Sequence, residues 1–284
     1  MVELIDRPDE SAPGRVGRAL LTIGWIALGL IGLGNQDFVL QWQPIPLDLP
    51  FRSSFADVSA LLLVAGGAGL IHPRSRRLAA AFLGLDVLLW IVCLKLPEAF
   101  AHPGSVGSWL GIAEDTTLML GPMVLASRTP PAGAFFGMTF LDDPRIVRGA
   151  QIVFALCCLE FAVCHFVYAD FTAAMIPDWI PGHLALAYLT GACHLAAGLA
   201  ILAGFEARLA AGLEALMMSL FALLLHLPSI WERPLPGWGS TVETVWVMLF
   251  IATSLSASAW MIATSIKRAE VVADAAELIA DSGV

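Results

Sequence analysis

The side chains of this sequence that could do chemistry in an apolar environment are concentrated in its second half. An ionisable residue within an apolar, membrane-like segment is costly, so it is a functional candidate by default. Imidazole and carboxylate groups can exchange protons, and aromatic rings can line a pocket for a hydrophobic ligand. The residues that could together form a pocket for a proton or a quinone are Glu160, His165, Trp179, His194, His226, Glu243 and Trp246.

The same region offers the ligand types of a metal or haem site. Imidazole suits zinc, copper and iron, and thiolate suits Cu(I) and zinc. The candidate ligands are His165, His194, His226, Cys164 and Cys193. No closely spaced ligand motif joins them, so three interpretations stay open: a metal or haem site, a proton or quinone pocket, and ordinary hydrogen bonds between helices. Cys164 and Cys193 could also form a redox pair, although buried thiols usually act as small hydrophobic groups.

The first half carries counterparts of this set in Asp86, Lys95 and Glu114. Lys95 and Glu114 fall at the facing ends of two consecutive apolar segments, and His226 and Glu243 do the same in the second half. Each pair therefore places a base near a carboxylate at matched depth. A structural role explains the carboxylates equally well, because the first turn of a helix stabilises negative charge.

The composition indicates which elements must position these residues. The 284 residues are 58% hydrophobic and 14% charged, whereas about 25% of an average globular protein is charged. The excess of 24 Asp and Glu over 15 Lys and Arg excludes a nucleic-acid-binding protein, which needs clustered basic surface. A helix needs about 20 apolar residues to cross a bilayer. The sequence therefore predicts an all-α polytopic membrane protein with eight transmembrane helices, near residues 19–33, 55–71, 78–96, 108–126, 146–167, 183–203, 207–227 and 242–264.

The basic residues predict how these spans are oriented, because Lys and Arg favour the cytoplasmic side. With eight spans, all Lys and Arg except Arg52, Lys95 and Arg233 fall on one side. We therefore expect an integral protein of the bacterial inner membrane with both termini in the cytoplasm, and we call the opposite side the outer side. Residues 1–18 form a cytoplasmic tail without the features of a signal peptide. Residues 265–284 form a cytoplasmic amphipathic segment that lies on the membrane or on a partner, or else a frayed acidic tail.

Short motifs recur in the same order in both halves, which indicates an internal duplication. A shift of 131 residues places Arg77-Leu78-Ala79-Ala80 on Arg208-Leu209-Ala210-Ala211, and Leu96-Pro97 on Leu227-Pro228. Each copy holds four spans, so the copies share one orientation, unlike the inverted repeats of many transporters. We expect two parallel four-helix-bundle repeats, at residues 19–127 and 147–264, joined by a cytoplasmic linker at residues 128–146.

A family resemblance rests on motifs of the second copy. These are Ile176-Pro177-Asp178-Trp179-Ile180-Pro181, Leu189-Thr190-Gly191, Ala197-Gly198-Leu199-Ala200, Ala207-Arg208-Leu209-Ala210-Ala211 and Leu225-His226-Leu227-Pro228. With them the chain resembles the DoxX and DoxX-like membrane proteins, which are four-helix bacterial units. His194 stands where that family often has a carboxylate after the Thr-Gly element. The resemblance implies a tandem duplication of the four-helix unit and a role in quinone-coupled sulfur oxidation or in a membrane-associated redox complex.

Three functions follow from these observations, and the sequence leaves open whether the protein is an enzyme. The first is a membrane subunit of a redox complex that binds a quinone, a metal or a haem near the outer face of the second repeat. The second is a small-solute or ion permease in which Asp86, Glu160 and His194 line a path between the halves. The third is an assembly or accessory subunit that binds another membrane or periplasmic protein. The concentration of acids and histidines in the second repeat favours the first function.

Overall fold

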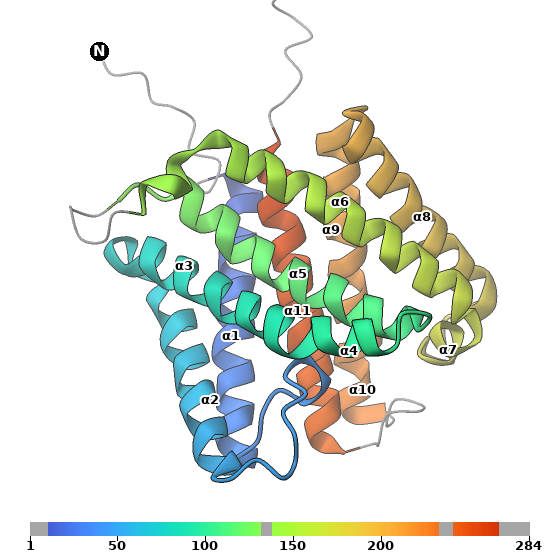
Figure 1. The fold of residues 1–284 in the computed structure, drawn as a ribbon. Coiled ribbons are helices and arrows are strands. Elements are labelled where there is room, and N and C mark those ends of the chain that lie inside the picture. Colours follow the sequence, from blue (N-terminus) through green and yellow to red (C-terminus); the bar gives the residue numbers. More distant parts are fainter. Residues whose placement is uncertain (1–10, 132–137, 233–240, 267–284) are drawn as a thin grey trace, which may run out of the picture.

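The regular structure of the chain is helical throughout the part that the computed structural model describes, residues 11–131, 138–232 and 241–266 (Figure 1). No strand occurs in these ranges, which confirms the predicted all-α class. The α-helices are α1 (Ala12–Asn35), α2 (Arg52–Gly69), α3 (Pro73–Trp90), α4 (Leu96–Ala101), α5 (Val106–Arg128), α6 (Pro144–Val167), α7 (Ala169–Ala174), α8 (His183–Ala203), α9 (Ala207–Phe221), α10 (Leu227–Glu232) and α11 (Val242–Ser265). Short helical segments are η1 (Leu40–Trp42), η2 (Ile91–Lys95), η3 (Thr139–Asp142) and η4 (Ala222–His226).

Some sequence predictions fall outside the described residues. They are most of the N-terminal tail, part of the linker at residues 132–137, and the amphipathic C-terminal segment beyond Ile266. Within the described ranges, each of the eight segments predicted to span the membrane coincides with a long helix or a continuous pair of helices.

Polar residues at the helix starts explain where several helices begin. The hydroxyl groups of Ser11, Ser105 and Thr241 accept a backbone N–H in the first turn of α1, α5 and α11, and the carboxylate of Asp143 does the same for α6. These N-caps satisfy donors that have no partner inside the helix. Proline in the first turn of α1 and α6 removes one such donor altogether.

Six of the helices are long and apolar enough to cross a membrane, which supports an integral membrane protein. They are Ala12–Asn35, Pro73–Ala101, Pro144–Val167, His183–Ala203, Ala207–Trp231 and Val242–Ser265. The other two helices that the sequence predicts as spans, α2 and α5, are not among the six. α5 carries Glu114 and Asp115 near its middle, and packs against α3, α6 and α11. Ionisable residues of membrane helices almost always face the interior of the helix bundle rather than lipid.

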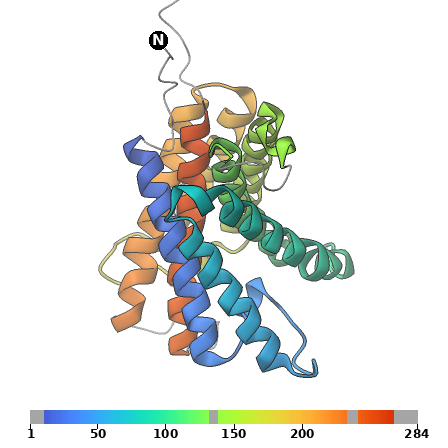
Figure 2. The ribbon, with the colours of Figure 1, turned by 90° about the vertical axis from the view of Figure 1, so that its left-hand side faces the viewer.

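The long helices form one bundle with α11 and α5 in its interior. Figures 1 and 2 both show α1 (blue) beside α11 (red), and this is among the most extensive helix contacts. α11 also packs against α9 and α5, and it is the most deeply buried of the six candidate spans. The start of α1 and the end of α11 lie at the same end of the bundle (Figure 1).

Glycines permit close approach of neighbouring helices in both halves. A Cβ atom at Gly29 of α1 would lie 2.5 Å from the carbonyl oxygen of Ala60 on α2. A Cβ atom at Gly198 of α8 would lie 2.8 Å from the carbonyl oxygen of Ala155 on α6. Both distances are too short for a side chain, so the backbones meet where only glycine fits. Small residues serve this purpose in many membrane helices.

Two π-helical segments interrupt otherwise continuous helices just before a proline. η2 joins α3 to α4, and η4 joins α9 to α10, and Leu96-Pro97 and Leu227-Pro228 follow them. Proline lacks an N–H and its ring collides with the carbonyl group four residues earlier, so it kinks or breaks a regular α-helix. A π-turn relieves this conflict without ending the helix. The last residues of the two segments, Lys95 and His226, are both buried.

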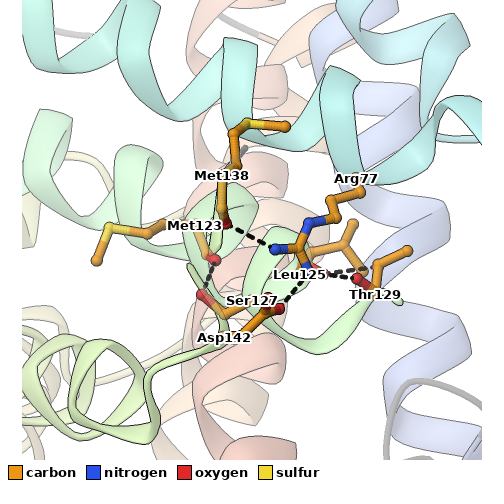
Figure 3. A network of polar contacts seen from close by, with 7 residues as sticks. All are labelled: Arg77, Met123, Leu125, Ser127, Thr129, Met138 and Asp142. Carbon is orange, nitrogen blue, oxygen red and sulfur yellow. Dashed lines mark hydrogen bonds and ion pairs between the residues drawn. The ribbon is translucent and has the colours of Figure 1, made fainter. Parts of the chain in front are cut away.

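An arginine at the start of α3 ties this helix to the end of α5 (Figure 3). The Arg77 guanidinium donates to the carbonyl oxygens of Thr129 (2.9 Å) and Met138 (2.9 Å), and to the carboxylate of Asp142 (2.7 Å). Thr129 is the C-cap of α5, so the guanidinium satisfies a carbonyl that the helix leaves free. At the matching position Arg208 of α9 donates to the carbonyl oxygen of Ile266, the C-cap of α11, at 3.5 Å and in an exposed setting.

Candidate functional site

A buried histidine and a buried glutamate form the most conspicuous polar contact inside the second half of the chain. His194 of α8 is 2% exposed and Glu214 of α9 is 1% exposed. Nδ1 of His194 lies 2.6 Å from Oε1 of Glu214, a short contact of the kind made by charge-assisted hydrogen bonds. One proton lies between these two atoms, whether it is bonded to Nδ1 of His194 or to Oε1 of Glu214. The second carboxylate oxygen of Glu214 is buried and has no hydrogen-bond partner.

His165 of α6 joins this pair to form a cluster of three ionisable side chains, which we call the His–Glu cluster (His165, His194 and Glu214). The imidazole rings of His165 and His194 meet edge to face with their centroids 4.9 Å apart. Nδ1 of His165 lies 3.2 Å from the carbonyl oxygen of Ala187 and 2.9 Å from the hydroxyl group of Thr190. A carbonyl oxygen only accepts, so the contact to Ala187 orients a proton on Nδ1 and leaves Nε2 of His165 as the acceptor.

Aromatic rings enclose the His–Glu cluster. The Phe221 ring of α9 stacks on His165 at 6.1 Å and lies 6.0 Å from His194, and the Phe161 ring of α6 lies 5.6 Å from His194. Such surroundings have a low dielectric constant, which strengthens each polar contact within them. The cluster therefore combines ionisable groups with an apolar wall of aromatic rings.

The structure brings together only part of the predicted pocket. His165 and His194 are in contact, although the sequence places His194 deeper in its helix. His226 is buried on η4 with an Nδ1 atom that has no partner, and no contact to the His–Glu cluster is found within the described ranges. Glu243 lies beside Asn35 and Asp37, at the end of α1, rather than beside His226.

The remaining predicted pocket residues are scattered. Glu160 of α6 is half-buried and one of its carboxylate oxygens has no partner. Trp246 stacks on Phe250 of its own helix at 6.1 Å, and Trp179 is 59% exposed in the loop before α8. These positions favour a small site at the His–Glu cluster over a wide pocket lined by both tryptophans.

The cysteines and the possible metal ligands do not converge. Cys164 is buried and Cys193 is exposed, and both are free thiols. In the part of the chain that the structure describes, no group of three or more His, Cys, Asp or Glu side chains is arranged to hold a metal ion.

The first-half counterparts lie apart from this cluster. Lys95 and Glu114 both contact the loop between α1 and α2. Asp86 lies one turn before Trp90 on α3, and one oxygen of the Asp86 carboxylate is buried without a hydrogen-bond partner. Glu214 has no acid at the matching position of the first half, where Leu83 stands.

Glu214 was missed by sequence reasoning although a signal for it exists. It is the lone carboxylate in the apolar segment 207–227, and an acid in such a segment is a functional candidate by default. Its partner could not be inferred, because the spacing along the chain says nothing about which faces of α8 and α9 meet.

Comparison with known proteins adds no family to this description, since no family model, no curated protein and no solved structure matches the chain. The resemblance to DoxX-like proteins thus remains a hypothesis that rests on the motifs of the second half.

Proposed function

We propose that this protein is an integral membrane subunit of a redox complex, linked to quinone, in which the His–Glu cluster binds the quinone and exchanges its protons. The observation that carries the proposal is the fully buried His194–Glu214 hydrogen bond with the His165 ring against it. A quinone, when bound, accepts two electrons and two protons, so a site for it needs proton-exchanging groups next to an apolar wall. Phe161 and Phe221 supply that wall.

Each member of the His–Glu cluster has a distinct part in this proposal. Glu214 holds the His194 ring in one orientation through Nδ1, which leaves Nε2 of His194 free to accept or donate a proton. His165 is held by Ala187 and Thr190 near the outer end of α6, where it can pass a proton between His194 and the outer side. The free carboxylate oxygen of Glu214 can accept a further hydrogen bond.

The cofactor content of gently solubilised protein tests this function. Mass spectrometry and an absorbance scan should detect a bound quinone in the wild-type protein. His194→Gln and Glu214→Gln should each weaken retention by about tenfold or more, as expected for the loss of a hydrogen bond to a charged group. His183→Gln is the matched control, because His183 lies at the start of α8 and its hydrogen bond within the described residues goes to the carbonyl oxygen of Pro177.

The outcome of that measurement separates the candidates. A protein without quinone, haem or metal, or an equal loss in the His183→Gln control, would contradict binding at the His–Glu cluster. A haem or metal retained in place of quinone would keep the redox role and change the cofactor.

The proposal includes eight membrane spans arranged as two parallel four-helix repeats, with both termini in the cytoplasm of a bacterial cell. Equivalent contacts in the two halves support it: α1–α2 matches α6–α8, α3–α5 matches α9–α11, and α5–α6 matches α11–α1. The π-segments η2 and η4 are 131 residues apart, which is the shift found in the sequence. The first and fourth helices of each repeat make little contact, so each repeat depends on the other to complete its packing.

Reporter fusions after Arg74 and His102 distinguish eight spans from six. If α2 and α5 cross the membrane, a reporter that is active only outside the cytoplasm should be silent after Arg74 and active after His102. If only the six most apolar helices cross it, the two signals should be reversed. The reason is that each additional span before a fusion point inverts its location.

A permease is the second candidate, favoured by carboxylate oxygens of Asp86 and Glu160 that are buried without partners. The predicted path through Asp86, Glu160 and His194 lacks support, because His194 is paired with Glu214 and no contact joins the three in the described structure. Flux of a small solute or ion into proteoliposomes, without bound quinone, would favour this candidate. An accessory role would be favoured if neither flux nor a cofactor were found and a membrane enzyme co-purified.

A further inference from the structure

A second group of ionisable side chains lies in the first half, on helices other than those of the His–Glu cluster. We call it the Lys95 site (Lys95 of η2, with Glu114 and Asp115 of α5). Lys95 is 5% exposed and lies over Gly111, where a Cβ atom would be 3.1 Å from Nζ. Residues three and four positions after Gly111 lie on the same side of α5, so the ammonium group lies over the face that carries both carboxylates.

Asp115 is the unsatisfied member of the Lys95 site. Its side chain is 0% exposed, and both carboxylate oxygens are buried without a hydrogen-bond partner. It lies within electrostatic range of Lys95 and Glu114. A buried charge is very costly without a partner, and a carboxyl group in that situation avoids the cost by holding a proton.

The partners of Lys95 and Glu114 come from the outer loop (residues 36–51, between α1 and α2). Nζ of Lys95 donates to the backbone carbonyl of Gln41, and Nε1 of Trp42 donates to Oε2 of Glu114 at 3.0 Å. Within the described residues no ion pair joins Lys95 to either carboxylate. The outer loop, rather than Asp115, therefore holds the ammonium group in place.

The outer loop packs against the helices and covers the Lys95 site. Trp42 is fully buried, and Gln43 ties the loop down by donating to the Ser59 hydroxyl group at 2.8 Å. Leu40 has a φ angle of +41°, a left-handed conformation that is strained for a branched side chain. Such strain persists only where the surroundings impose it, and it is often found in segments that switch between conformations.

We propose that the Lys95 site is a proton-binding site facing the outer side, with Asp115 as the proton carrier and the outer loop as its gate. When the loop withdraws, Lys95 loses the Gln41 carbonyl and is free to turn toward Asp115. The O–H bond of the Asp115 carboxyl group then breaks, the proton passes to water on the outer side, and the remaining carboxylate is paired by the ammonium group. Closure of the loop reverses each step.

The charged surroundings of Asp115 fit this exchange. Lys95 faces it from η2 and Glu114 from its own helix. On α6, Cys164 lies within electrostatic range of Glu114 and Glu160. Among charged groups on the other helices packed against α5, Asp86 of α3 lies beside Trp90, and Glu243 of α11 lies beside Asn35 and Asp37, so neither faces Asp115.

Infrared spectroscopy of the full-length protein in lipid nanodiscs tests the proton carrier. The wild-type spectrum should contain the carbonyl-stretch band of a protonated carboxyl group, and the band should shift when the buffer is changed from H₂O to D₂O. Asp115→Asn should remove the band, Asp115→Glu should move it, and Asp86→Asn should leave it unchanged. A band that survives in Asp115→Asn, or that is lost in Asp86→Asn instead, overturns the assignment.

The rate of the D₂O shift tests the gate. Trp42→Phe keeps an aromatic ring but removes the hydrogen bond to Glu114, so the shift should be about tenfold faster, as expected for the loss of one hydrogen bond. Trp109→Phe is the control, since it removes a tryptophan hydrogen bond on the same helix as Glu114 that goes to the carbonyl oxygen of Pro103 and to no member of the Lys95 site. Equal rates in wild type and Trp42→Phe, or equal acceleration in Trp109→Phe, overturn the gate.

This proposal stands apart from quinone binding at the His–Glu cluster. Glu214→Gln should leave the Asp115 band and its exchange rate unchanged, and Asp115→Asn should leave quinone retention unchanged. These measurements can therefore contradict one of the two proposals while the other holds.

Discussion

Replacing Arg77 with alanine should lower the free energy of unfolding by about 2–4 kcal/mol, because the substitution removes three hydrogen bonds of a buried charged group. The guanidinium is nearly inaccessible to solvent, and two of its acceptors are backbone carbonyl oxygens (Figure 3). Asp142 is half-exposed and remains hydrated after the substitution, which keeps the cost below that of a fully buried pair. Unfolding in detergent, followed by circular dichroism as denaturant is added, measures the change.

Arg208→Ala is the matched control, since it alters the same Arg-Leu-Ala-Ala motif in the other half. The Arg208 hydrogen bond to Ile266 is long and exposed, so its removal should cost about 0.5 kcal/mol or less. Arg77→Lys should recover only a small part of the stability, because an ammonium group cannot reproduce the fork of the guanidinium. Equal effects of Arg77→Ala and Arg208→Ala would contradict the structural role assigned to Arg77.

Arg77 also shows where sequence reasoning stops. As part of a basic cluster it predicts the cytoplasmic side of the membrane, and nothing in its neighbours distinguishes it from Arg74 and Arg76. The structure adds that its side chain is buried against Thr129 and Met138, more than 50 positions away. Burial of one arginine among several depends on the packing of α3 on α5, which local sequence does not encode.

The helices themselves were predictable because their signals are local. Runs of apolar residues indicate where the helices lie, whereas the N-caps Ser11, Asp143 and Thr241, at which three of them start, are seen only in the structure. The π-segments were not predictable as such, although each Leu-Pro pair marks a position where a regular helix is strained. Local signals do not decide whether α2 and α5 cross the membrane, because crossing depends on the lipid and on how far neighbouring helices shield the polar residues of α2 and α5.

The candidate site was predicted only in part, because the sequence identifies ionisable residues in apolar segments but does not say which of them meet. His165 and His194 were singled out because histidine is rare in apolar segments, and the structure places their rings in contact. The pairing of His194 with Glu214 depends on the rotation of α8 against α9, and no spacing along the chain fixes it. Among the described residues no ion pair joins His226 to Glu243, which lies on α11 beside Asn35 and Asp37.

Gly121→Leu should destabilise the protein by about 3 kcal/mol or more, because α5 and α11 meet at this glycine with no room for a side chain. A Cβ atom at Gly121 would lie 2.2 Å from the Ser258 hydroxyl oxygen and 2.7 Å from the Ser258 Cα atom. The second distance involves backbone, so a change of rotamer cannot relieve it and the helices must move apart. Chemical unfolding in detergent measures the decrease in stability.

Two further variants show whether the helix crossing itself is responsible. Gly212→Ala is the control, since no atom lies within 4 Å of the added Cβ position, and its effect should be about 0.5 kcal/mol or less. Ser258→Gly combined with Gly121→Ala should restore about 1 kcal/mol relative to Gly121→Ala alone, because neighbouring residues couple by amounts of this size. Only part is restored, since the Ser258 Cα atom remains. An additive double mutant would show that α5 and α11 do not meet here, and the two halves would then be held together chiefly by the packing of α1 against α11 and of α5 against α6.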